Sequence, residues 1–225
     1  MISVIIPTLN EAGLLPDTLR HVQANSAPHE ILVVDGGSGD DTVKQAQTAG
    51  ARVFESPQRQ RAFQMNLGAR RAQGDLFLFL HADTWVGPNA LGQITEAFRD
   101  PAVAGGGFAR QFRSPSRLLR LTCLLSEWRS RWCGWFFGDQ GIFVHRAIFE
   151  QLGGYQDLPL FEDVDFSRRM TRHGRTVTLR SNVVSSARRF ADRGALVVCI
   201  SDLWLTIRYL AGADPRRLVT RKAQT

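Results

Sequence analysis

Two short apolar strands, each ending abruptly in polar residues, dominate the first forty residues of the sequence. Val4-Ile5-Ile6 leads into Pro7-Thr8-Leu9-Asn10-Glu11, and residues 31–34 lead into Asp35-Gly36-Gly37-Ser38-Gly39-Asp40. With a helix between them, these strands predict a βαβ unit, which places both polar loops at the carboxyl edge of a parallel sheet. Open α/β sheets bind ligands at this edge, and Asp35 offers it a fixed carboxylate. The sequence therefore predicts a nucleotide site within its first forty residues.

Strands and helices continue to alternate through the first hundred residues. Apolar runs predict strands at residues 2–6, 30–34, 52–55, 75–80 and 102–112, and helical patterns lie between them at 13–24, 40–49, 61–73 and 88–99. The run at 75–80 is apolar after its first residue, as expected of a strand covered on both faces. This alternation predicts an α/β fold with a mostly parallel, doubly wound sheet and flanking helices.

The second half of the chain is less regular. It contains a Leu-, Arg- and Trp-rich helix, short strands and helices, and an amphipathic helix followed by a basic tail, at residues 114–137, 141–145, 146–152, 161–173, 177–179, 183–186, 194–211 and 216–222. For a chain of 225 residues we expect one domain at 1–190, with a segment at 191–225 that is part of it or appended to it.

Charge is distributed unevenly along the chain, whose formal net charge is +7. Arginines gather in the second half, which suits an anionic partner such as a phosphate, a nucleic acid or an acidic membrane surface. No nucleic-acid-binding motif accompanies them, so we expect no nucleic-acid partner. The three cysteines have no metal-ligand spacing and fit a reducing compartment. No apolar stretch reaches the ~18–20 residues of a membrane span, and Met1 leads directly into a core strand, so we expect a cytoplasmic protein.

Two groups of acidic residues suggest chemistry. Asp83 follows the apolar run 75–80, where a carboxylate is costly unless it meets a metal ion or a ligand. A Mg²⁺ ion bound there could bridge a pyrophosphate, whereas the alternative is a helix cap or a loop residue. Glu162, Asp163 and Asp165 begin a helix, where the helix dipole favours acids, but a carboxylate there could also act as a general base.

Together, these segments resemble the inverting glycosyltransferases of family 2, which have the GT-A fold and move a sugar from a nucleotide diphosphate to an acceptor hydroxyl. The resemblance covers residues 1–190, with motifs in the family's order: Pro7-Thr8-Leu9-Asn10-Glu11, residues 34–40, Asn66 with Gly68, His81-Ala82-Asp83, and Glu162-Asp163. Four segments further resemble a bacterial subfamily associated with arsenosugar biosynthesis: Gln64-Met65-Asn66, residues 79–84, Gly138-Asp139-Gln140-Gly141 and Ser186-Ala187-Arg188-Arg189.

The resemblance implies a role for each matching position. It implies a nucleotide pocket built from the early loops, with these residues: Thr8, Glu11, Asp35, Arg61 and Asn66. It implies that Asp83 holds Mg²⁺ or Mn²⁺ against the diphosphate, and that Asp163 is the catalytic base with Glu162 beside it. It also implies that three polar residues face the sugar, the acceptor or the leaving diphosphate: Gln140, Arg188 and Arg189.

The resemblance also implies the partners and leaves one point open. The donor would be a nucleotide-sugar, of which a UDP-sugar is the first choice, and the acceptor a hydroxyl on a small or lipid-linked molecule. Many relatives have two or three acids at the metal motif, whereas this chain has His81 and Ala82 before a single Asp83. The metal affinity of this motif is therefore the open point.

Two helical segments, 117–137 and 196–210, combine apolar, aromatic and basic residues. In one interpretation they form an acceptor pocket or rest on an anionic bilayer, which would make the protein peripheral to the inner face of the membrane. In the other, their apolar faces close the core and their arginines face water. The sequence leaves both interpretations open.

Two other function classes compete with a glycosyltransferase. A nucleotidyltransferase would share the βαβ nucleotide site and the metal aspartate. Such enzymes usually have a Gly-rich, Arg/Lys-containing phosphate loop after the first strand, where this chain has Pro7-Thr8-Leu9-Asn10-Glu11. A non-catalytic module that docks on a nucleotide or a membrane is supported by the basic charge alone.

Overall fold

The computed structural model describes residues 1–222, apart from the side chains of residues 181, 182 and 220–222, so the last three residues of the expected segment 191–225 lie outside it. The first half contains these elements: β1 (Ile2–Thr8), α1 (Leu15–Gln23), β2 (His29–Asp35), α2 (Thr42–Thr48), β3 (Arg52–Glu55), α3 (Arg61–Arg71), β4 (Leu76–Phe79), β5 (Thr84–Trp85), α4 (Ala90–Ala97) and β6 (Val103–Phe112). The second half contains α5 (Arg117–Cys133), a 3₁₀ turn (Gly138–Gln140), β7 (Ile142–His145), α6 (Arg146–Gln151), α7 (Glu162–Met170), β8 (Arg175–Ser185), α8 (Arg188–Arg193), α9 (Ala195–Leu210) and α10 (Pro215–Lys222).

The strands form a single mixed sheet in the order β3-β2-β1-β4-β7-β6-β8-β5. The first four of these strands run parallel, so β1 and β2 end side by side, with Thr8 opposite Asp35. β7 then runs antiparallel between β4 and β6, while β6 and β8 are parallel. The predicted α/β fold with flanking helices is confirmed, and the parallel half of the sheet is the part that the sequence specified.

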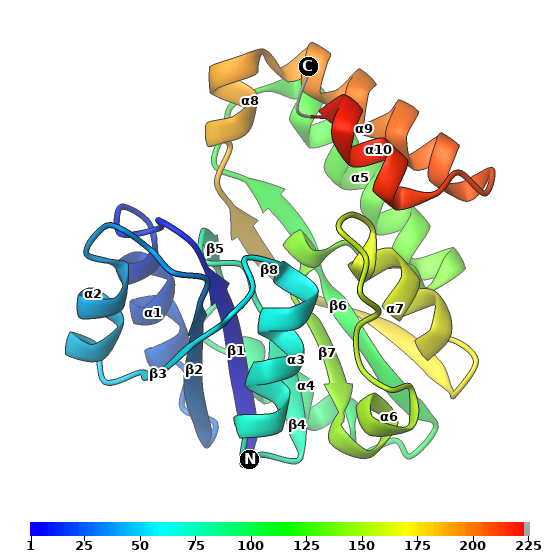
Figure 1. The fold of residues 1–225 in the computed structure, drawn as a ribbon. Coiled ribbons are helices and arrows are strands. Elements are labelled where there is room, and N and C mark those ends of the chain that lie inside the picture. Colours follow the sequence, from blue (N-terminus) through cyan, green and yellow to red (C-terminus); the bar gives the residue numbers. More distant parts are fainter. Residues whose placement is uncertain (223–225) are drawn as a thin grey trace.

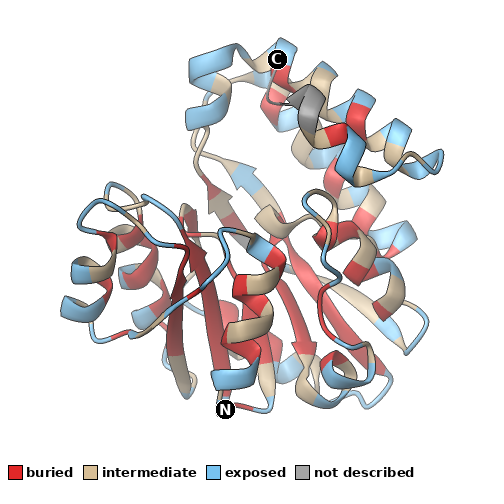
Figure 2. Ribbon diagram, in the orientation of Figure 1, coloured by how far each residue is buried: buried red, intermediate tan, exposed pale blue. Residues whose placement is uncertain are grey.

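The core lies on both faces of this sheet (Figure 2). β1 is buried along its whole length, and alternate residues serve opposite faces. Val4 and Ile6 pack with α1 and α4, whereas Ile5 packs with α3 and the aromatic residues around α6 and α7. Because both faces of β1 are covered, its carboxyl end emerges from a rigid setting, which fixes the position of the loop that follows.

Four helices, α5, α8, α9 and α10, gather above β6, β8 and α7 (Figure 1). Ser116 caps α5 by accepting a hydrogen bond from the Leu119 amide, and Gly134 ends the helix in the left-handed conformation. The predicted basic tail is the helix α10, and neither β5 nor α8 is predicted from the sequence. This helical layer follows β6 and β8 in the chain and lies beside α7, which begins with Glu162 and Asp163.

The predicted strands 177–179 and 183–186 form one continuous strand, β8. The polar pair Arg180-Ser181 interrupts the apolar pattern and suggests a break between two strands. In the structure, β8 remains paired with β6 through this point, with a register shift between Phe108 and Ala109. Such an irregularity accommodates extra residues without ending the ladder.

We predict that Gly106→Ala destabilises the protein strongly. A Cβ atom at this position of β6 would lie 1.9 Å from the backbone oxygen of Val177, and a backbone atom in a central sheet cannot move aside. We expect a loss of at least about 1–3 kcal/mol of unfolding free energy in urea titrations, or an insoluble product. Gly13→Ala is the control, because nothing lies within 4 Å of its added Cβ. Equal stability of the two variants would contradict the close strand packing described here.

Candidate active site

The loop after β2 is organised by the buried carboxylate of Asp35, which is 1% exposed. Asp35 accepts four hydrogen bonds: from Thr8 Oγ1 at 2.9 Å, Ser38 Oγ at 2.6 Å, Gly37 N at 2.9 Å and Ser38 N at 2.7 Å. Its two oxygens offer about four acceptor positions, so this loop fills them. Thr8 and Asp35 are therefore brought together as predicted, and Asp35 fixes the shape of the loop.

Gln64 of α3 joins the ends of β1 and β2. Its buried amide group donates to the carbonyl oxygens of Thr8 and Val34, both at 2.8 Å. In the sequence, Gln64 stands out only as part of the segment Gln64-Met65-Asn66, with no role of its own.

Asn66 lies elsewhere than predicted. Its side chain accepts from the Tyr155 amide at 2.9 Å and donates to the Tyr155 carbonyl at 2.8 Å. Both of its polar atoms therefore hold the segment before α7. The structure does not bring Asn66 to the loops of β1 and β2 that form the expected nucleotide pocket.

Asp163, Glu162 and Arg61 form a compact charged group at the start of α7. Glu162 is 4% exposed, and its Oε1 lies 3.1 Å from Nη1 of the half-exposed Arg61. Asp163 Oδ2 accepts from the Gly138 amide at 2.6 Å, and Asp163 Oδ1 accepts from the Val164 amide at 2.7 Å. The backbone donors fix the Asp163 carboxylate in orientation, and Arg61 compensates the buried charge of Glu162.

The pKa of Asp163 is raised to about 7, mainly by burial and also by the neighbouring charge of Glu162. The hydrogen bond from Gly138 and the charge of Arg61 act in the opposite direction, since both stabilise the ionised form. The result is a carboxylate that changes protonation state near neutral pH. A group of this kind can accept a proton from a hydroxyl and release it again.

A narrow pocket adjoins Asp163, and it has room for about one water molecule. Its lining includes Asp163, Glu162, Arg61, His81 and Tyr155. Two buried polar atoms, His81 Nε2 and Tyr155 Oη, have no hydrogen-bond partner within the described residues. Burial lowers the pKa of His81, and the charge of Arg61 lowers it further, so the imidazole is neutral at pH 7. Met65, Phe79 and Ile142 also line the pocket, which is thus a small and largely apolar recess beside the carboxylate.

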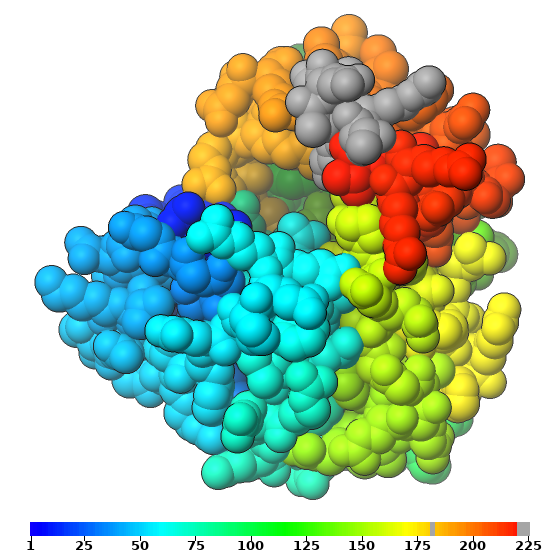
Figure 3. All heavy atoms as spheres, in the orientation of Figure 1, coloured from blue at the N-terminus to red at the C-terminus, as the bar shows by residue number. Residues whose placement is uncertain are grey.

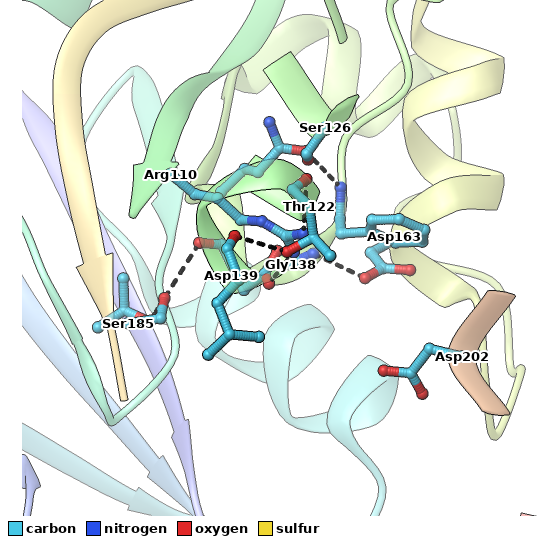
Figure 4. Close-up of polar contacts among 12 residues, drawn as sticks. Arg110, Thr122, Ser126, Gly138, Asp139, Asp163, Ser185 and Asp202 are labelled. Carbon is cyan, nitrogen blue, oxygen red and sulfur yellow. Dashed lines mark hydrogen bonds and ion pairs between the residues drawn. The ribbon is translucent and has the colours of Figure 1, made fainter. Parts of the chain in front are cut away.

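The 3₁₀ turn at Gly138–Gln140 contains the Gly138 amide that donates to Asp163. Two arginines contact this turn: Arg110 pairs with Asp139, and Arg129 donates to Gln140. Arg110 of β6 forms an ion pair with Asp139 and reaches the Thr122 carbonyl of α5 at 3.4 Å. Figure 4 shows Arg110, Asp139, Gly138 and Asp163 close together, with Thr122 beside Arg110. Arg110 and Asp139 were not predicted as site residues, because their partners lie far away in the sequence.

Gln140 completes this turn from the inside. It is fully buried, its Oε1 accepts from Arg129 Nη2 at 2.6 Å, and its Nε2 donates to the Phe108 carbonyl at 3.1 Å. The predicted contact of Gln140 with sugar or acceptor is therefore not the arrangement in this structure. Gln140 links α5 and β6 to the turn that positions Asp163.

Glu11 and Arg188 meet across the site although they lie at opposite ends of the chain. Arg188 Nη2 lies 3.3 Å from each carboxylate oxygen of Glu11. Figure 3 shows the surface hollowed between the loops of the N-terminal half and the C-terminal helices. Arg189, in contrast, forms an ion pair with Asp202 of α9. The structure thus brings one of the two predicted arginines to the predicted nucleotide pocket.

Asp83 has the environment expected of a metal ligand that shares its ion with a substrate. Its carboxylate is partly exposed and accepts one long contact within the described part of the chain, from Thr84 Oγ1 at 3.4 Å. Residues 1–222 contain no cluster of three or more His, Cys, Asp or Glu side chains that could hold a metal alone. A single open carboxylate fits Mg²⁺ or Mn²⁺ that is bound mainly by substrate phosphates and water.

Comparison with known sequences identifies the family. The model for Glycosyl transferase family 2 matches residues 3–149, more than half of the chain. A PGL/p-HBAD biosynthesis glycosyltransferase of Mycobacterium bovis is 30% identical over 202 residues, which cover 82% of this chain and 75% of that protein. An uncharacterized glycosyltransferase of Mycobacterium tuberculosis is 38% identical over 194 residues, which cover 80% of this chain and 72% of that protein.

Solved structures share the fold at low sequence identity. The mannosyltransferase PcManGT of Pyrobaculum calidifontis, in complex with GDP-Man and Mn²⁺, matches with a TM-score of 0.71 at 22% identity, over 96% of this chain and 66% of that one. S. aureus TarS 1–349 in complex with UDP-GlcNAc matches with a TM-score of 0.63 at 16% identity, over 82% and 58%. The chain spans less than two thirds of these solved proteins, and the likeness shows the fold alone. The chain belongs to glycosyl transferase family 2 and is a glycosyltransferase with the GT-A fold.

Proposed function

We propose that the protein transfers a sugar from a nucleotide diphosphate donor, with a UDP-sugar as first choice, to an acceptor hydroxyl with inversion at the anomeric carbon. The observation that carries this proposal is the environment of Asp163. Its carboxylate is oriented by two backbone amides, borders a small recess and has a pKa raised to about 7. These are the properties of a general base that works at neutral pH.

In the proposed reaction, Asp163 takes the proton of the acceptor hydroxyl while that oxygen attacks the anomeric carbon. The bond between this carbon and the diphosphate oxygen breaks on the opposite side, and the diphosphate leaves with the electron pair. A single displacement of this kind inverts the configuration. Glu162 acts on Asp163 as a neighbouring charge that maintains its high pKa, and Arg61 holds Glu162 in place.

The proposed donor site lies at the ends of β1 and β2. Because the loop already fills the acceptor positions of Asp35, we assign Asp35 a positioning role: it holds the backbone against which the base binds. Arg188, which is paired with Glu11, is suited to the leaving diphosphate because guanidinium groups match phosphate oxygens. The solved relatives that contain GDP-Man or UDP-GlcNAc support a nucleotide-sugar as donor.

Asp83 would hold Mg²⁺ or Mn²⁺ in this proposal. When bound, the ion would neutralise charge on the diphosphate. The solved relative with Mn²⁺ supports this assignment for the fold.

The narrower subfamily associated with arsenosugar biosynthesis remains part of the proposal. Segments that carry this resemblance contribute to one site: Gln64 joins β1 to β2, His81 lines the recess, Gly138 donates to Asp163 and Arg188 meets Glu11.

We predict that Asp163→Asn lowers the rate of sugar transfer by about 10²- to 10⁴-fold, the range that a general base contributes. The Kd for UDP, measured by calorimetry, should change little, because Asn keeps the shape of the side chain. Asp165→Asn is the matched control, since Asp165 lies in the same helix but pairs with Arg169. Full transfer activity in Asp163→Asn would assign the base elsewhere, and a protein without any transferase reaction would not distinguish the two variants.

The raised pKa of Asp163 predicts opposite effects of pH on rate and stability. Transfer should increase as pH rises through about 7, because the base must be ionised. Since the folded pKa exceeds the ordinary value of 3.8, ionisation of Asp163 in the folded protein costs stability as pH rises from about 4 to 7. Asp163→Asn removes this cost. Its stability relative to the parent should increase by roughly 1–3 kcal/mol between pH 5 and pH 8 in urea titrations, and a difference independent of pH would contradict the raised pKa.

We predict that Mn²⁺ increases the thermal stabilisation by UDP through Asp83. A ligand that binds only the folded state at about 100 times its Kd contributes about 2.7 kcal/mol, which is readily seen as a rise in Tm. In Asp83→Asn, stabilisation by UDP alone should persist and the increment from Mn²⁺ should disappear. An unchanged Mn²⁺ increment in this variant would place the metal away from Asp83.

A further inference from the structure

The helix α5 has its polar and apolar sides reversed relative to an ordinary surface helix. Its side toward the protein buries Ser126 and Ser130, whereas Leu124, Trp128 and Trp132 are 64%, 61% and 77% exposed. Besides Leu119, the buried residues of α5 are these serines, and Ser126 accepts a hydrogen bond from Arg129 of the same helix while the Thr122 carbonyl accepts one from Arg110. The outer side is therefore apolar without serving the core.

The helix α9 extends the same kind of surface. Of the fourteen large apolar side chains exposed in the part of the chain that the structure describes, twelve lie on α5 and α9. We call these twelve the apolar face: Leu121, Leu124, Leu125, Trp128, Trp132, Leu196, Val197, Ile200, Leu203, Trp204, Ile207 and Leu210. The two helices are in contact and lie together in the helical layer (Figure 1). Concentration on two adjoining helices distinguishes this surface from scattered exposed residues.

The spacing of these residues forms one stripe along each helix. On α5 they recur at intervals of three and four residues from Leu121 to Trp132, and on α9 they do so from Leu196 to Leu210. No helix within residues 1–222 has the length and hydropathy required to span a bilayer. A helix with an apolar stripe and charged flanks lies instead in the interface between lipid and water. The neighbouring indoles of Trp128 and Trp132, with ring centroids 6.4 Å apart, suit that interface.

The positive charge of the chain is concentrated in the same segments. Residues 117–133 and 188–222 contain twelve Arg and Lys against four Asp and Glu, a surplus of eight. The whole chain has a net charge of only +7, so the remaining residues are nearly neutral. Exposed arginines of this set that flank the apolar face include Arg117, Arg120, Arg193 and Arg208. An apolar surface with a basic border is complementary to a bilayer that contains anionic lipids.

We propose that the apolar face of α5 and α9 docks on the surface of an anionic lipid bilayer. Charge decides between this partner and a second copy of the chain, because a symmetric dimer through this face would bring two strongly basic surfaces together. The sequence left two interpretations of these helices open, and their exposed apolar sides favour the membrane. Docking would hold the active site at the membrane surface, since the inner side of α5 supports the turn that positions Asp163.

Co-sedimentation of the full chain with vesicles tests this proposal. We expect binding to vesicles of phosphatidylcholine and phosphatidylglycerol, weak binding to phosphatidylcholine alone, and loss of binding at high salt. The double variant Trp128→Ser/Trp132→Ser should bind anionic vesicles about tenfold more weakly or worse with an unchanged Tm, because both side chains are already exposed. Arg117→Gln/Arg120→Gln should weaken binding about tenfold. Arg70→Gln/Arg71→Gln, exposed on α3 outside the face, is the matched control and should bind normally.

Three results would overturn the proposal. The first is a parent chain that binds no vesicle, and the second is equal binding to neutral and anionic vesicles. The third is a stable dimer in light scattering that Trp128→Ser/Trp132→Ser converts to a monomer, which would make the face a contact between copies. The binding assay contains no donor or acceptor. Its failure would therefore leave the proposed transfer reaction untouched, and loss of transfer in Asp163→Asn would leave vesicle binding untouched.

Discussion

The site depends on two carboxylates that are withdrawn from water and held by backbone amides. Removing an ionised carboxylate from water is costly unless hydrogen bonds replace the lost hydration. Asp35 receives such bonds from Gly37 and Ser38, and Asp163 receives them from Gly138 and Val164. Each carboxylate therefore stabilises the conformation of a turn: Asp35 that of residues 36–38, and Asp163 that of residues 138–140. Asp163 also has a charged neighbour, since Glu162 opposes its ionisation and, together with burial, raises its pKa.

The parallel half of the fold could be predicted from the sequence because its determinants are local. Continuous apolar runs identify the strands, and the polar residues that follow each run identify the carboxyl edge of the sheet. Thr8 and Asp35 come together for this reason alone. The sequence likewise indicates candidate site residues among the acids that follow strands or begin a helix, namely Glu11, Asp83, Glu162 and Asp163.

Residues whose partners lie far away in the sequence could not be assigned in this way. Asn66 and Gln140 match motifs, yet the structure uses the first to hold the segment before α7 and the second to hold a turn. Arg110 carries no motif and is nevertheless held against Asp139. The sequence also could not predict which side of α5 faces outward, because the periodicity of apolar residues defines a stripe but not whether that stripe faces the core or the solvent. Buried serines under exposed tryptophans are visible only once the helix has been placed.

The ion pair between Glu11 and Arg188 bears on how the proposed donor enters. We assign both side chains to the nucleotide pocket, so a donor that uses them must first separate them. Arg188 is half exposed, and pairs in such settings contribute only about 0–1 kcal/mol. Burial also raises the pKa of Glu11 despite the nearby guanidinium, which shows that desolvation offsets much of the attraction. The contact is thus weak enough to open for a charged diphosphate.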